Sequence, residues 1–252
     1  MSTHLGTEIT MHADDAPQPP KRKRRPSKGA PSLSSDRIIA AALDLIDTQG
    51  VENFSMRNLA KLLGVYPMAI YWYVPNRNAL VARVTAHVLA DLVPEDPGAD
   101  WQDDLRTLLH RFRAIIRAHP NVAPLIGAQL VSNASVDLKM IEWVLQVLRR
   151  SGLNEADIPA AYTATIGAMT GFVTQEFAAV PQHDKTGWAD ELKQIAQSAD
   201  PEQFPLAAAL MPKLLNRSFI LRWDNGSAVP LDDGFDIFVE SFIAGLARRA
   251  RH

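Results

Sequence analysis

Residues 55–77 read SMRNLAKLLGVYPMAIYWYVPNR, and this stretch decides the fold. It predicts two short helices joined by a tight turn at Gly64, an arrangement that places the second helix in a DNA groove. Ser55 is positioned to cap the first helix, and Gly64 suits the left-handed residue that commonly ends one. Pro67 is tolerated only in the first turn of a helix, so it fixes where the second helix begins. The stretch therefore predicts a helix-turn-helix unit.

The second predicted helix carries three aromatic residues in a row, Tyr71, Trp72 and Tyr73. Ile70 and Val74 are four residues apart and therefore point inward from one face. The aromatic side chains are left facing outward, which is unfavourable in water unless that face meets another molecule. The basic residues nearby favour DNA as that molecule. Packing of the aromatic residues in the core and docking of a protein partner are the alternatives.

Helices are also predicted on both sides of this stretch. The preceding one begins near Ser35, which is positioned to cap it, and ends at Gly50. The residues predicted to face inward are Ile39, Ala42, Leu43 and Ile46, followed by Leu59, Leu62 and Leu63 of the next helix. The helix after the stretch spans 76–93, and Pro94 breaks it. Residues 34–80 are thus predicted to form a three-helix DNA-binding domain.

The charge is divided unevenly along the chain, although the net charge is only −2. Residues 21–80 hold ten Lys and Arg against four acidic residues, whereas 81–252 hold sixteen against twenty-one. Residues 1–33 contain few large apolar side chains and are predicted to be a disordered basic arm. Arg24 and Arg25 in this arm are candidate DNA contacts. A solubilising tail or an import signal is the alternative reading of the basic cluster.

The chain beyond residue 94 is predicted to be entirely helical, with no strand alternation and no internal repeat. The expected helices span 101–118, 122–131, 135–150, 157–177, 204–223 and 232–251, with a polar surface excursion at 180–202. The fold class is therefore all-α: an N-terminal three-helix helix-turn-helix domain followed by a larger helical domain over 81–252.

The composition excludes several classes of protein. The chain has no cysteine, no Gly-rich phosphate loop and no GxSxG motif, and its seven histidines lack the spacing of a metal site. We therefore expect no catalysis, no cofactor and no metal. No apolar run approaches the roughly 18 residues of a membrane helix, and no signal peptide is evident, so we expect a soluble cytoplasmic protein that does not contact membranes.

The N-terminal motifs resemble the tetracycline repressor (TetR) family of transcriptional regulators. The resemblance is carried by FSMRNLAKLLGV at 54–65, IYWYV at 70–74 and NRNAL at 76–80. It covers residues 35–82, and a weaker similarity continues from residue 101 to the helix that holds Trp143. The resemblance implies that the larger domain is a tetracycline-repressor-type domain for ligand binding and dimerisation.

The resemblance also assigns roles in DNA binding. Arg57 matches a position that reads a base edge, where arginine can make a two-point contact to guanine. Pro67 and Ala69 stand where the tetracycline repressors place Gln and Thr, which implies a different operator. Tyr71 matches a phosphate-contacting tyrosine, and Arg77 replaces a lysine that holds a phosphate. The predicted DNA contacts are Ser55, Met56, Arg57, Tyr66, Pro67, Met68, Ala69, Tyr71, Trp72, Tyr73, Arg77, Arg24 and Arg25.

For the larger domain, the resemblance implies a homodimer in which the 157–177 helix and the last helix form a four-helix bundle with their symmetry mates. Gly167 and Gly171 are four residues apart and would permit close helix approach. Three aromatic residues form a stripe on the last helix: Phe235, Phe238 and Phe242. Packing within one subunit is the alternative for these residues.

A small-molecule pocket is expected among the middle helices. Its predicted lining is Met140, Trp143, Met169, Phe172, Gln175 and Glu176, although each of these also suits an ordinary core. Leu125 stands where tetracycline repressors use a histidine to bind drug-chelated magnesium, although Glu176 falls near one of their acidic positions. The loss of the histidine argues against a tetracycline–magnesium ligand. The effector is therefore expected to be another, mainly apolar, small molecule.

Together these observations predict a dimeric, ligand-responsive regulator, a repressor that an effector releases from a palindromic double-stranded DNA operator. The alternative is a helical protein-interaction module whose aromatic helix docks a protein partner.

Overall fold

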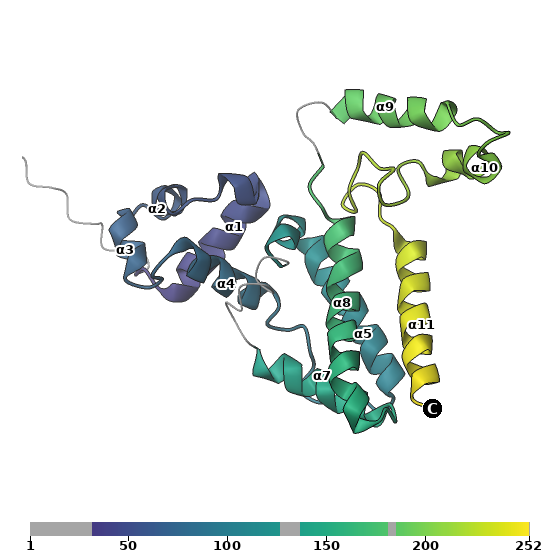
Figure 1. The fold of residues 1–252 in the computed structure, drawn as a ribbon. Coiled ribbons are helices and arrows are strands. Elements are labelled where there is room, and N and C mark those ends of the chain that lie inside the picture. Colours follow the sequence, from purple (N-terminus) through teal and green to yellow (C-terminus); the bar gives the residue numbers. More distant parts are fainter. Residues whose placement is uncertain (1–31, 127–136, 181–184, 252) are drawn as a thin grey trace, which may run out of the picture. The chain divides into compact units, whose positions relative to one another are not determined.

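The computed structural model describes residues 32–126, 137–180 and 185–251. Regular structure in these ranges is helical throughout, with no strand (Figure 1), so the predicted all-α class is confirmed. The boundaries predicted at 33/34 and 80/81 stay predictions. Arg24 and Arg25, with most of the predicted arm, lie outside the described residues.

Helix α1 spans Ser35–Asn53, and the residue that caps it lies one position earlier than predicted. The side chain of Ser34, and not of Ser35, accepts the hydrogen bond from the Arg37 amide at 3.2 Å. Gly50 interrupts the helix with a φ of 77°, as its position predicted. Ile38 and Leu45 are buried where Ile39 and Leu43 were predicted, because α1 packs against both α2 and α4 and its buried face is set by both neighbours.

Helices α2, Met56–Leu63, and α3, Pro67–Tyr71, form the predicted helix-turn-helix. The Ser55 side chain accepts from the Asn58 amide at 3.1 Å, and Gly64 adopts the left-handed conformation with a φ of 68°. The prediction that Leu62 faces inward is wrong, since its side chain is 52% exposed. It lies on the outer side of α2 because this helix buries only a narrow face.

Helix α4, Arg77–Val88, is shorter than the predicted 76–93 helix. Asn76 caps it by accepting from the Ala79 amide at 2.8 Å. Beyond the helix, Leu92 and Val93 are buried in a turn and anchor the connection to the core. Pro94 restricts the residue before it to extended backbone, which is incompatible with a helix that reaches 93.

The larger part of the chain is built on four long helices that pack against one another (Figure 1): α5 Trp101–Ala118, α7 Leu138–Arg150, α8 Ile158–Glu176 and α11 Asp232–Arg249. The short 3₁₀ turns are η1 Pro120–Val122 and η2 Glu155–Asp157. The prediction for α5 is confirmed to the residue, and those for α8 and α11 to within two residues. These helices carry strong apolar faces that are buried against each other, which makes their periodicity easy to read.

Two further helices, α9 Lys185–Gln197 and α10 Pro205–Leu214, pack against each other. The predicted helix over 204–223 is wrong in its second half. The chain leaves the helix at Leu214, and Asn216 and Ile220 adopt positive φ angles of 58° and 73°, which no helix contains.

Candidate nucleic-acid interface

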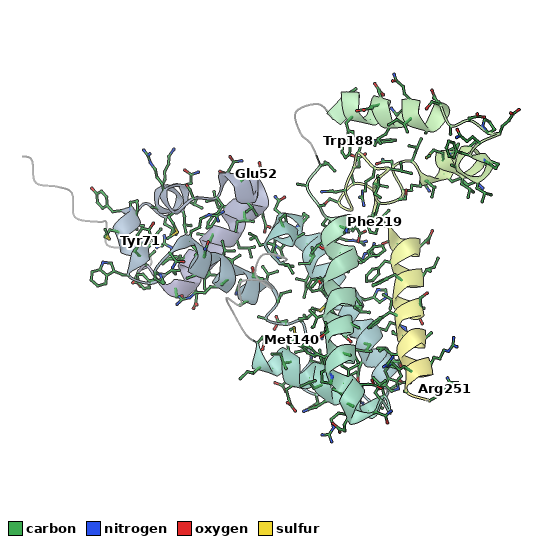
Figure 2. The ribbon with its side chains drawn as sticks, viewed as in Figure 1. Glu52, Tyr71, Met140, Trp188, Phe219 and Arg251 are labelled. Carbon is green, nitrogen blue, oxygen red and sulfur yellow. The ribbon has the colours of Figure 1, made fainter. Side chains whose placement is uncertain are left out.

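The outer surface of α3 and its flanks is made of aromatic and apolar side chains. Trp72 is 86% exposed, Tyr66 82% and Met68 69%, while Ile70 and Val74 on the opposite side are fully buried. Tyr71 and Tyr73 are 42% and 40% exposed, and Figure 2 shows Tyr71 at the outer side of α3. The aromatic residues therefore form a surface, as predicted, and not a core.

Helix α2 adds two cations to this unit. Arg57 and Lys61 are four residues apart, lie on the same face and are exposed. Within the described ranges neither has a hydrogen-bond or ion-pair partner. Both charges are therefore available to a polyanion.

Two arginines of α4 link parts of the DNA-binding unit, which comprises α1 to α4. Arg77 lies over the Phe54 ring at 5.3 Å and directs Nε and Nη2 to the carbonyls of Phe54 and Val51, both at 3.4 Å. Arg83 donates from Nη1 to Ser35 Oγ and to the Tyr73 carbonyl, both at 3.1 Å. Arg83 thus ties the end of the aromatic segment to the start of α1. Arg77, predicted to contact a phosphate, has a positioning contact as well.

Three of the predicted DNA contacts are not displayed on this surface. Met56 is only 8% exposed and packs in the core of the unit. The Ser55 hydroxyl accepts the capping hydrogen bond, and Ala69 is half-buried. Pro67, in contrast, is exposed at the first position of α3.

A polar joint links α1 to the segment after α5. Asn121 Nδ2 donates to the carbonyls of Ile46 and Asp47, at 3.1 and 2.9 Å. His119 Nδ1 lies 2.7 Å from Asp47 Oδ2, and the other carboxylate oxygen of Asp47 is buried and has no hydrogen-bond partner among the described residues. The sequence did not reveal this joint, because its partners are more than 70 residues apart and match no motif.

A buried ion pair joins α5 to the carboxyl end of α8. Arg113 on α5 contacts both carboxylate oxygens of Glu176 on α8, each at 2.7 Å, and Glu176 is fully buried. Glu176 also accepts from the Leu231 amide at 3.0 Å. Burial acts to lower the pKa of Arg113, but the contacts with Glu176 and Asp232 outweigh it and raise that pKa.

The chain that leads into α11 closes over this ion pair. The Gly226 amide donates to the Glu176 carbonyl at 2.7 Å, and a Cβ atom at Gly226 would lie 2.5 Å from Cγ of Glu176. Only glycine permits so close an approach. Asp232, at the first turn of α11, pairs with both Arg113 and Arg117, at 2.8 and 2.7 Å. The Glu176 carboxylate is thereby fully engaged by the protein.

The six residues predicted to line an effector pocket differ in burial. Trp143 and Met169 are buried, Met140 is half-buried, and Gln175 is exposed. A cavity of about 550 Å³ lies beside Phe172 and Phe219, and none of the other five borders it. Trp143 is nevertheless unusual, because its Nε1 donor is buried with no hydrogen-bond partner in the described part of the chain.

The aromatic stripe predicted on α11 is only partly a surface. Phe235 is fully buried inside the subunit, with its ring 5.3 Å from that of Phe172 and below the Arg113 guanidinium. Its packing within one subunit was the alternative reading. Gly167 and Gly171 of α8, in contrast, are exposed, and nothing lies within 4 Å of a Cβ built on either.

No helix in residues 32–126, 137–180 and 185–251 has the length and apolar character needed to span a membrane. Across the same ranges, no three His, Asp or Glu side chains gather in a way that would hold a metal ion.

The exposed cations of α2, the aromatic surface of α3 and the tightly capped turn between them define a helix-turn-helix DNA-binding protein with a helical regulatory body. Residues 38–84 match the family described as bacterial regulatory proteins, tetR family. Residues 93–249, more than half of the chain, match the tetracyclin repressor-like C-terminal domain. The chain therefore belongs to the TetR family of transcriptional regulators.

Individual relatives agree with this membership. An HTH-type transcriptional regulator of Saccharopolyspora erythraea is 28% identical over 193 residues, which cover 76% of this chain and 80% of that protein. ActR of Streptomyces coelicolor, solved in complex with actinorhodin, is 25% identical with a TM-score of 0.65, covering 88% of this chain and 100% of ActR. BioQ, solved with its double-stranded DNA operator, is 26% identical with a TM-score of 0.54, covering 65% of this chain and 97% of BioQ.

Proposed function

We propose that this regulator is a homodimeric repressor that binds a palindromic operator in the bacterial cytoplasm and is released by a small, mainly apolar effector. It acts by binding, without catalysis. The observation that carries the proposal is the surface of the helix-turn-helix, where the exposed Arg57 and Lys61, unpaired within the described residues, lie beside an exposed aromatic face. BioQ, which shares the fold, is solved on its DNA operator.

Dimerisation through α8 and α11 is supported by the exposed small residues of α8. Gly167 and Gly171 leave room for a second helix to approach closely, and Ile237 on α11 is 69% exposed. In a dimer, two recognition helices enter successive major grooves about 34–36 Å apart, which requires a palindromic site. Introducing a large charged side chain, as in Gly171→Arg, should convert the dimer to a monomer in sedimentation velocity.

Two observations bear on the chemistry of the proposed effector: one favours a hydrogen-bond acceptor on it, and the other argues against a metal-chelated ligand. Among the residues that the structure describes, none pairs with the buried Trp143 Nε1, and buried donors are rarely left unpaired in native structures. An acceptor on a bound molecule would pair with it. The Glu176 carboxylate is held by Arg113 and Leu231 and is not free to bind a metal, which agrees with a ligand other than tetracycline–magnesium. ActR, another member of the family, is solved with actinorhodin.

Effector binding weakens DNA binding only if the effector prefers the conformation that does not fit the operator. By similarity to the tetracycline repressor family, an effector in the larger domain would shift α4 and change the spacing of the two recognition helices. A second route is the joint that Asn121 and His119 make with α1. A shift of the segment after α5 would move α1, and Arg83 links the start of α1 to the end of the aromatic segment.

The proposal is tested by incubating the full-length protein with a pool of random double-stranded DNA and sequencing the bound fraction. We expect enrichment of a palindrome, and binding that weakens steeply with added salt because several phosphates are contacted. A panel of apolar aromatic compounds should include one that lowers operator affinity while the dimer persists. An effector that strengthened binding or dissolved the dimer would contradict this mechanism.

The alternative, a protein-interaction module, rests on the same aromatic surface. It predicts that no DNA sequence is enriched and that partner binding depends weakly on salt.

A further inference from the structure

The recognition helix has an unusual chemical character. Residues 66–73, YPMAIYWY, contain no Arg, Lys, Asn, Gln, Asp, Glu, Ser or Thr. The two-point hydrogen bonds that identify bases in the major groove come from Arg or Lys on guanine and from Asn or Gln on adenine. No side chain of this segment can make such a contact. Only the Tyr hydroxyls and the indole N–H of Trp72 can form single hydrogen bonds.

The beginning of α3 is the part that a helix-turn-helix presents to base edges. Here it carries Pro67 and Met68, both exposed, the latter at 69%. Neither side chain has an N–H or O–H group. The unit is fixed in this orientation, because Ile70 and Val74 are fully buried behind it and Arg83 holds the Tyr73 carbonyl. The surface that the start of α3 presents to the groove is therefore apolar.

The C5-methyl group of thymine is the apolar feature of base edges in the major groove. An apolar side chain over a guanine or cytosine edge would remove water from polar atoms without replacing their hydrogen bonds, which is unfavourable. On these grounds we infer that α3 recognises thymine methyl groups through Met68 and Pro67. Arg57 on α2 supplies the hydrogen-bonded contact to a guanine in the same half-site. This inference rests on the proposed function, since it requires α3 to enter a major groove.

The inference divides operator reading between two helices. The half-site contains thymines facing the start of α3 and a guanine facing Arg57. Each buried thymine methyl contributes about a fourfold gain in affinity, the fold-change that corresponds to burying one methyl-sized group. Replacement of thymine by uracil removes this methyl group and keeps every hydrogen-bonding atom of the base pair.

The test uses the full-length protein and the duplex enriched from random DNA. Each thymine of one half-site is replaced singly by uracil, and the dissociation constant is measured by fluorescence anisotropy at fixed salt. We expect one or two adjacent positions to lose about fourfold in affinity, and the others to change little. At those same positions, a 5-methylcytosine·guanine pair should bind better than cytosine·guanine by a similar factor.

Two variants assign the effect to α3. In Met68→Ala the ratio of affinities for thymine and uracil duplexes should fall toward one at the sensitive position. In Lys61→Ala, which removes an exposed cation of α2, both duplexes should weaken equally and the ratio should stay unchanged. Folding of each variant is checked by its thermal unfolding temperature.

The outcomes separate this inference from the proposed function. If no duplex is enriched, the proposed function fails. If a duplex is enriched but uracil is tolerated at every position, α3 does not read methyl groups and the inference is overturned. A ratio that is unchanged in both Met68→Ala and Pro67→Ala would also overturn it, because the methyl contact would then belong to another residue.

Discussion

The recognition segment is residues 66–73, and the Glu176 cluster is Glu176 with Arg113 and Asp232. Both depart from the usual distribution of side chains, but in opposite ways. On the recognition segment, Trp72 and Met68 are 86% and 69% exposed, although apolar side chains usually lie inside. At the carboxyl end of α8, Glu176 is fully buried, although carboxylates usually lie outside. In each case, the surroundings explain the exception.

The physical basis of the two exceptions differs. The Glu176 carboxylate has its partners within the protein. Arg113 neutralises its charge and donates to both of its oxygens, and the Leu231 amide donates a further hydrogen bond. The exposed side chains of α3, in contrast, are left uncovered by the protein. A satisfied buried charge thus marks a structural clamp between α5, α8 and α11, whereas an exposed apolar face marks a binding surface. Mutations in the two regions should therefore affect different measurements.

The largest expected effect on stability is at the clamp. Glu176→Ala leaves Arg113 buried without its main counter-charge, and we expect the free energy of unfolding to fall by about 3–5 kcal/mol in urea titration. Glu240→Ala is the matched control, since it breaks a similar two-point contact with Arg106 at an exposed site. Exposed pairs contribute little. Equal losses in the two variants would show that burial of the pair is unimportant.

Two methionines of the DNA-binding unit give a second comparison. Met56 is 8% exposed and Met68 is 69% exposed, twelve residues apart. Met56→Ala should lower the free energy of unfolding by about 2–5 kcal/mol, because it opens a cavity. Met68→Ala should change stability by less than about 0.5 kcal/mol but weaken operator binding. Thermal unfolding and fluorescence anisotropy on the same samples would show whether either variant changes both stability and operator affinity.

The joint that Asn121 makes between η1 and α1 should show an intermediate effect. Asn121→Ala removes two hydrogen bonds to the last buried turn of α1, each with a net contribution of about 1 kcal/mol. We expect amide hydrogens of that turn to exchange about tenfold faster or more. Asn53→Ala is the control, because its Nδ2 donates only to Gln49 at the end of the same helix. Similar exchange in both variants would exclude a role for Asn121 in coupling.

The smallest expected effect depends on pH. The hydrogen bond from Arg117, together with Arg113, lowers the pKa of Asp232 below its ordinary value near 3.8. Because the folded-state pKa is lowered, the carboxylate contributes stability above pH 4 or so, and this contribution is lost as pH falls through the folded-state pKa. Asp232→Asn should therefore be slightly less stable at pH 7, and its difference from the native protein should shrink below about pH 4. A constant difference would rule out this linkage.

Local chemistry made much of the DNA-binding unit predictable. Ser55, Gly64 and Pro67 act on backbone within a few residues of themselves, so their roles as cap, left-handed turn and first helical residue were evident before the fold was known. The inward positions of Ile70 and Val74 followed from spacing alone. Ala42 and Ile46 on α1 were also predicted correctly, whereas Ile39 and Leu43 on α1 and Leu62 on α2 were mispredicted, because their burial depends on which neighbouring helix lies against that face.

Features that join distant parts of the chain were not predictable. Glu176 was expected to line a pocket, and nothing near it in sequence indicates that Arg113 reaches it across α5 and α8. The Phe235 side chain was expected on a surface stripe, yet it is buried below Arg113. The roles of individual DNA contacts and pocket residues stay predictions.

The sequence by itself determined the helix-turn-helix, the family and the apolar character of the recognition segment, because these depend on residue type and short-range spacing. The tertiary structure alone decided which of two methionines is core, which arginine is structural, and where the body is clamped. These properties depend on contacts between side chains that lie tens of residues apart in the sequence. A buried charge is tolerated when such a contact pairs it and is unfavourable when none does.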